Sequence, residues 1–142
     1  MRLMLALLLT GALAPPLAAQ DAPVVPGSVS SVEAGGYWSS GGVEGQYRLI
    51  IDTGGMEHVV SQAFLQWLSQ PRDAEGSVVV ITSVPLTELN TGVWRFDSPA
   101  FQLRHGVWEA TIDGLNSHTQ PPVRARWCLR LGPPGVYSVV AE

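Results

Sequence analysis

The sequence predicts an all-β fold, most simply an antiparallel β-sandwich of about eight to nine strands. Apolar and polar residues alternate with period two along several runs, as in half-buried strands. Turn signals rich in Gly, Pro, Asn and Asp separate these runs at short intervals. The 142 residues are 46% hydrophobic and only 14% charged, so the chain has enough apolar surface for one folded domain, which we place at residues 31–142.

The first 19 residues have the order of a secretory signal peptide. Arg2 precedes a short apolar run over residues 3–14, which Pro15 ends, and small residues lead to an expected cleavage after Ala19. The run is shorter than the roughly 20 residues that span a bilayer, so no transmembrane segment is expected after cleavage. These features predict a bacterial protein that is periplasmic or secreted.

Residues 20–30 are small, polar and proline-containing, which predicts a flexible N-terminal arm. From Ser31 onward, glycine pairs punctuate extended runs. In the run 43–52, one parity carries Val43, Tyr47, Leu49 and Ile51, and the other is mostly polar, which indicates a strand with one buried face. Residues 52–55 form the turn candidate that follows.

Residues 56–70 fit two structures. Their apolar positions follow the i, i+3, i+4, i+7 spacing of an amphipathic helix, which would give an α+β fold with one helix at about 56–69. Their length matches the neighbouring runs 43–53 and 77–88, and turn-like segments join all three, as in a β-meander. We favour the strand on this context and keep the helix as the alternative.

The rest of the chain continues the strand pattern. Pro85 within residues 77–89 indicates an edge strand or a bulge. Residues 113–122 are polar and contain two prolines, so a loop is expected there. The further strands are predicted at 93–96, 100–103, 107–112, 123–131 and 136–140.

Charge and motifs exclude several classes of function. The net charge of −4 and the scattered arginines argue against binding to nucleic acid or to an anionic membrane. A single cysteine rules out an intrachain disulfide scaffold. The sequence contains no dinucleotide-binding or P-loop motif, so no cofactor is expected. His58, His105 and His118 have no metal-ligand spacing, so no metal site is expected from sequence either.

The run 123–131 carries the strongest local charge pattern. Arg124, Arg126 and Arg130 share one strand face with Cys128. The arginines are candidates for binding a carboxylate, a phosphate or an acidic partner, and the alternative is that they pair with cross-strand Asp or Glu. Nearby guanidinium groups would stabilise a thiolate, so Cys128 is a candidate reactive thiol, with a half-buried structural thiol as the alternative.

Five tryptophans are many for a chain of this length. Strand parity assigns Trp67, Trp108 and Trp127 to the core. Trp38 and Trp94 lie near turn glycines and are freer to be exposed, so they are candidates for stacking on a sugar ring or a peptide. Burial in the core remains the default expectation for both.

These observations favour an exported, non-enzymatic domain that binds a protein or glycan of the bacterial cell envelope. One rival is an enzyme whose site assembles from distant residues, with Cys128, His58 and a carboxylate as its constellation. A second rival is a structural or assembly protein that pairs through a sheet edge, in which Pro85 would guard against unwanted pairing.

Overall fold

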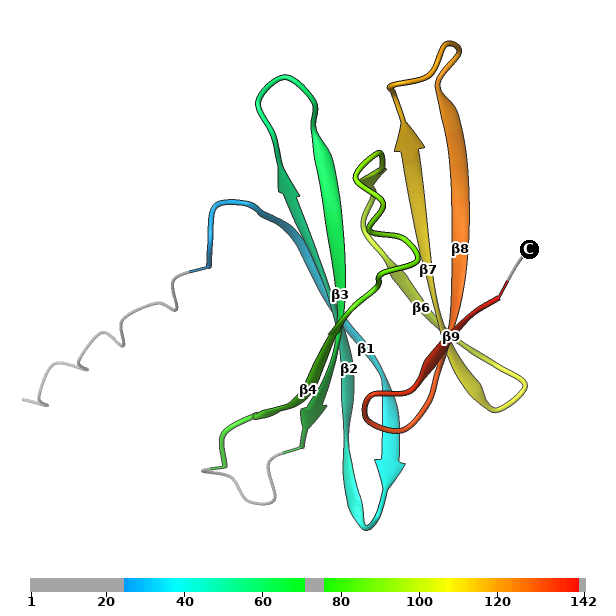
Figure 1. Ribbon diagram of the computed structural model, residues 1–142. Coiled ribbons are helices and arrows are strands. Elements are labelled where there is room, and N and C mark those ends of the chain that lie inside the picture. Colours follow the sequence, from blue (N-terminus) through cyan, green and yellow to red (C-terminus); the bar gives the residue numbers. More distant parts are fainter. Residues whose placement is uncertain (1–24, 71–75, 141–142) are drawn as a thin grey trace, which may run out of the picture.

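The computed structural model describes residues 25–70 and 76–140 (Figure 1). This part of the chain holds nine strands in two antiparallel sheets and no helix, which confirms the predicted all-β fold and is consistent with an antiparallel β-sandwich. The predicted signal peptide, residues 1–19, and the first five residues of the predicted arm lie outside the described residues.

Each sheet is built from strands that follow one another in the chain. The first sheet has the order β1-β2-β3-β4, and the second has the order β5-β7-β8-β9, with β6 also paired to β7. The strands are β1 (Val29–Ser40), β2 (Val43–Gly54), β3 (Val60–Ser69), β4 (Val80–Pro85), β5 (Arg95–Phe96), β6 (Ala100–Arg104), β7 (Val107–Asn116), β8 (Val123–Leu131) and β9 (Tyr137–Val140).

Residues 86–94 connect the two sheets and pass between them (Figure 1). Leu86 and Leu89 are fully buried there. The Asn90 side chain accepts a hydrogen bond from the Ala63 N–H at 2.7 Å and donates one to the Ala63 carbonyl at 3.0 Å, so this segment is anchored to the first sheet. The strand predicted over 77–89 is therefore shorter and ends at Pro85, where the chain turns inward.

Residues 60–69 form a strand, so the helix proposed as an alternative at 56–69 is wrong. Ser61, Ala63, Leu65 and Trp67 are at most 1% exposed and alternate with more exposed residues. Strand β3 pairs with β2 on one side and β4 on the other, which satisfies its backbone groups. The helical spacing arose because the opposite face of this central strand also carries apolar side chains.

Several further boundaries differ from the expected ones. Strand β2 runs to Gly54, through most of the turn predicted at 52–55. Strand β5 covers only the second half of the run predicted at 93–96. Strand β1 begins at Val29, so it takes in the last two residues of the predicted arm. Strand β7 continues to Asn116, through the beginning of the loop predicted at 113–122. Asp113 extends the strand because it pairs with Arg126 of β8. Gly114 leaves space for Trp127, whose ring would lie 2.7 Å from a Cβ at that position.

The core lies between the sheets, and one backbone carbonyl accepts side-chain hydrogen bonds from two of its aromatic residues. The Gly132 carbonyl, just after β8, accepts hydrogen bonds from Tyr47 Oη at 3.1 Å and from Trp67 Nε1 at 2.9 Å. The Tyr47 and Trp67 rings meet edge to face with centroids 6.1 Å apart. Burial raises the pKa of the Tyr47 phenol, which favours its neutral, donating form.

We expect Gly45→Ala to destabilise the protein by about 2 kcal/mol or more, because a Cβ there would overlap the Leu68 carbonyl oxygen and crowd the Trp38 ring. Gly54→Ala is the matched control, because it lies in the same strand with no atom within 4 Å of its built Cβ, and its effect should stay within about 0.5 kcal/mol. Thermal unfolding of both variants measures the difference. Equal melting temperatures would contradict this packing.

Candidate functional site

The predicted arginine patch lies on the outer face of β8 and is largely paired. Arg126 makes a two-point contact with Asp113 of β7, with Nε–Oδ1 and Nη2–Oδ2 distances of 2.6 and 2.9 Å. Arg130 Nε lies 3.4 Å from Glu109 Oε1. Arg126 and Arg130 therefore pair with carboxylates of the neighbouring strand, as in the alternative given for the arginine patch. The hydrogen bond from Arg126 lowers the pKa of Asp113 below its usual value.

Arg124 and Arg126 line a shallow hollow of about 320 Å³ together with Asp113. The hollow would place an anionic ligand between two guanidinium groups. Its net charge is small, however, because the Asp113 carboxylate is part of the same wall and is already bound to Arg126. This geometry weakens the case for the arginines as a site for an acidic ligand.

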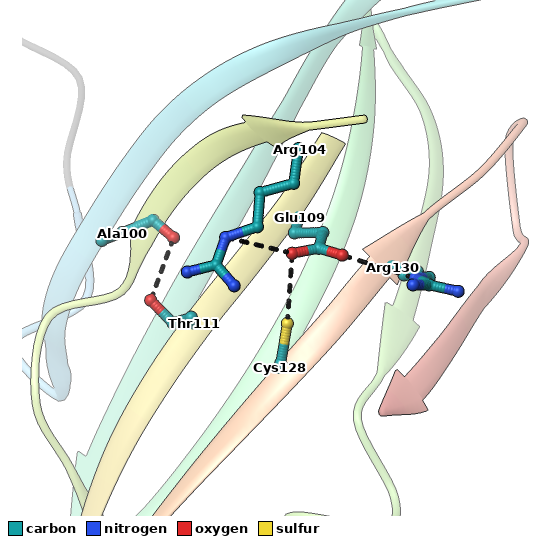
Figure 2. A network of polar contacts seen from close by, with 6 residues as sticks. All are labelled: Ala100, Arg104, Glu109, Thr111, Cys128 and Arg130. Carbon is teal, nitrogen blue, oxygen red and sulfur yellow. Dashed lines mark hydrogen bonds and ion pairs between the residues drawn. The ribbon is translucent and has the colours of Figure 1, made fainter. Parts of the chain in front are cut away.

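Cys128 belongs to a polar network on the same face (Figure 2). Its Sγ donates a hydrogen bond to Glu109 Oε2 at 3.6 Å, and the residue is only 3% exposed. Arg104 and Arg130 flank the Glu109 carboxylate, with Nε–O distances of 3.7 and 3.4 Å. The arginines thus face a carboxylate that accepts a hydrogen bond from the protonated thiol, and the geometry favours the structural alternative over a reactive thiol.

The fold does not bring His58 close to Cys128, the two residues suggested for an enzyme site. His58 lies in the β2–β3 connection, where its ring contacts His118 of the β7–β8 connection at a centroid distance of 4.9 Å. Cys128 lies within β8 and contacts Glu109. The described residues contain no group of three or more His, Cys, Asp or Glu that would share a metal ion.

Trp38 and Trp94 are not exposed stacking residues. Trp38 is 5% exposed and donates Nε1–H to the Gln46 carbonyl at 3.2 Å. It is buried because its strand partner is Gly45, whose missing side chain leaves room for the indole. Trp94 is half-buried and packs edge to face on Trp127, with centroids 4.9 Å apart. Burial in the core, the default expectation for both, is confirmed for Trp38, and Trp94 keeps only a partly exposed surface.

The exposed aromatic residue is the neighbour of Trp38. Tyr37 is 57% exposed and meets the half-buried Trp108 edge to face, with centroids 6.3 Å apart. A register shift in β1 between Gly35 and Tyr37 places the ring there, and Gly36 has a φ of 67°. A Cβ on Gly36 would lie 2.9 Å from the Trp108 ring, so glycine allows β1 to approach this indole closely.

Tyr37 and Trp108 line a hollow of about 240 Å³, which we call the aromatic hollow. Its walls come from the end of β1, from the β6–β7 turn at Gly106 and from the β8–β9 turn at Pro133. None of its lining residues in the described chain carries a charge. A second hollow of about 250 Å³ shares Tyr37 and adds Glu44 at its rim. The site suits a neutral ligand with apolar and hydrogen-bonding groups.

Sequence reasoning missed Tyr37, although a signal for it was present. Adjacent residues of a strand point to opposite faces, so of Tyr37 and Trp38 only one enters the core. Glycine precedes the pair, and the bulge it allows decides which aromatic is buried.

Comparisons of the chain with protein-family models, with curated proteins and with solved structures gave no match. The described residues include no helix that is long and apolar enough to cross a membrane. The case for function therefore depends on the geometry of the site.

We expect Cys128 to react slowly with a thiol reagent such as DTNB in the native protein and rapidly in denaturant, because its Sγ is buried and donates to Glu109. The measurement is the labelling rate followed at 412 nm (the absorbance of the released thiolate). Native labelling as fast as that of the denatured chain would restore the reactive-thiol interpretation.

Proposed function

We propose that the protein is an exported, non-enzymatic binding module that takes a neutral segment of a cell-envelope protein or glycan in the aromatic hollow. The observation that carries the proposal is Tyr37, an exposed aromatic ring fixed against Trp108 in a hollow with uncharged walls. Export is part of the proposal and is supported by the signal-peptide features of residues 1–19.

Fixed aromatic rings suit binding because they offer apolar contact area at a small entropic cost. Tyr37 rests on Trp108, so binding freezes little motion of the ring pair. Its hydroxyl and the Ser39 side chain add polar groups at the edge of the hollow. Sugar rings and proline or aliphatic side chains both combine an apolar face with polar edges, and either fits this lining.

The hollow offers little for catalysis. Its lining residues among those described are aromatic, aliphatic, proline, glycine and one serine. Glu44 is the cross-strand partner of that serine, Ser39, but no hydrogen bond joins the two side chains in the described part of the chain. A serine nucleophile needs a general base within hydrogen-bond reach. The polar network around Glu109 is on an outer sheet face and is internally paired. Binding is therefore the function that the geometry favours.

We expect Tyr37→Ala to abolish capture of the envelope ligand, because it removes the exposed half of the ring pair. The chain from Gln20 is immobilised, an envelope extract is passed over it, and retained protein and glycan are identified by mass spectrometry. Tyr37→Phe keeps the ring and should retain most binding. Val123→Ala, an exposed residue outside the hollow, is the control and should bind like the wild type. Identical retention by Tyr37→Ala would reject the hollow.

Strand β4 supports a second candidate function, assembly through a sheet edge. Among the described strands β4 pairs only with β3, so its other edge is open. Residues 78–81 are apolar and exposed, with exposed fractions from 43% to 56%. Pro85 ends the strand, where it lacks an N–H for pairing. An added strand would gain backbone hydrogen bonds and apolar contacts here.

If assembly uses this edge, the wild-type chain should be a dimer or larger in light scattering, and Ile81→Lys should convert it to a monomer. Lysine on an edge strand opposes strand addition through charge and solvation. Val123→Lys on the paired strand β8 is the control and should remain associated. A monomeric wild type would remove this candidate and leave the aromatic hollow.

A further inference from the structure

The two histidines at the opposite end of the sandwich form a site of their own, independent of the aromatic hollow. His58 lies between β2 and β3 of the first sheet, and His118 lies between β7 and β8 of the second. The two connections face each other across the open end of the two layers (Figure 1). The imidazole centroids are 4.9 Å apart, with the rings tilted by 42°.

We propose that His58 and His118 bind one divalent transition-metal ion, with Cu²⁺ bound most tightly. Imidazole nitrogen is a good ligand for Zn²⁺, Ni²⁺ and Cu²⁺, and Cu²⁺ has the highest intrinsic affinity of the series. The described residues contain no group of three or more His, Cys, Asp or Glu placed to hold one ion, so water completes the coordination. Two nitrogens with water suit the tetragonal geometry of Cu²⁺ or Ni²⁺ better than a closed zinc site.

The separation of the rings fits shared coordination. A metal–nitrogen bond of about 2.0–2.1 Å places the ion roughly 3.2 Å from a ring centroid. Two imidazoles at angles between about 90° and 110° then have centroids roughly 4.5–5.2 Å apart. The observed distance of 4.9 Å lies within this range.

The rings are available for a ligand. Both histidines are exposed, and neither imidazole makes a hydrogen bond within the described part of the chain. An exposed imidazole turns about its side-chain bonds, so one nitrogen of each ring is able to point at a shared ion. Each imidazole therefore has a nitrogen that can bind a metal ion.

Hydrogen bonds hold the backbone of the β7–β8 connection, and the β2–β3 connection turns tightly at Gly55. In the β7–β8 connection, the His118 N–H donates to Asn116 Oδ1 at 3.0 Å, and Thr119 Oγ1 donates to the Pro121 carbonyl at 3.0 Å. In the β2–β3 connection, Gly55 has a φ of 100°, and any Cβ there would overlap the His58 carbonyl. These contacts reduce the ordering cost of binding. A bound ion would join the two sheets where no strand pairing does.

The test is isothermal titration of the full-length chain, without a polyhistidine tag, with CuCl₂ and in parallel with redox-inactive NiCl₂. The variants are His58→Ala, His118→Ala and the double variant. His105→Asn is the matched control, because it changes the third exposed histidine, in the β6–β7 turn, where the φ of 49° tolerates asparagine. All chains share the same N-terminal amine and Cys128, so differences between them report on the histidines.

We expect the wild type and His105→Asn to bind one equivalent of metal that the double variant lacks, and each single variant to bind it about 10-fold or more weakly. The metal should also raise the melting temperature of the wild type but not of the double variant. Equal binding by wild type and double variant would overturn the proposal, as would loss only in His105→Asn. Loss of metal binding with unchanged capture by the aromatic hollow would show that the two sites are separate.

Discussion

The Gly132 carbonyl is the contact on which the arrangement of the two sheets depends. It lies just after β8 in the second sheet and accepts hydrogen bonds from Tyr47 and Trp67 of the first. Both lone pairs of a partly buried carbonyl are thereby satisfied, and two bulky rings are fixed in orientation. Tyr47 and Gly132 also line the aromatic hollow, so the contact that joins the sheets also sets the shape of the candidate site.

Glycines opposite indole rings allow the rest of the packing. Gly45 leaves room for Trp38, Gly114 for Trp127, and Gly36 for Trp108. In each case a built Cβ would lie within 3 Å of the ring, so a side chain at the glycine would force the indole away. This is why Trp38, which was freer to be exposed on sequence grounds, lies in the core. It also explains why Tyr37, and not a tryptophan, is the exposed aromatic residue of the hollow.

The sequence predicted the fold well where one face of a strand is buried and the other is exposed to solvent. Residues 43–52 and 123–131 alternate cleanly, and both became strands at the expected positions. Residues 60–69 were ambiguous because a central strand with apolar side chains on both faces loses its period of two. Asp113 and Gly114 fell within the predicted loop at 113–122, and only Arg126 and Trp127 on the next strand show why the chain is extended there.

The candidate sites were harder to predict because they depend on contacts that the sequence does not display. Tyr37 gains its place from a bulge, and His58 meets His118 only because two connections from different sheets converge. The arginine face shows the converse. Arg126 and Arg130 formed the clearest pattern in the sequence, yet Asp113 and Glu109 on β7 pair with both. Paired charges offer a ligand little, because binding must first displace an existing partner. The uncharged hollow at one end and the two imidazoles at the other are therefore the surfaces where a ligand can bind without displacing an existing partner.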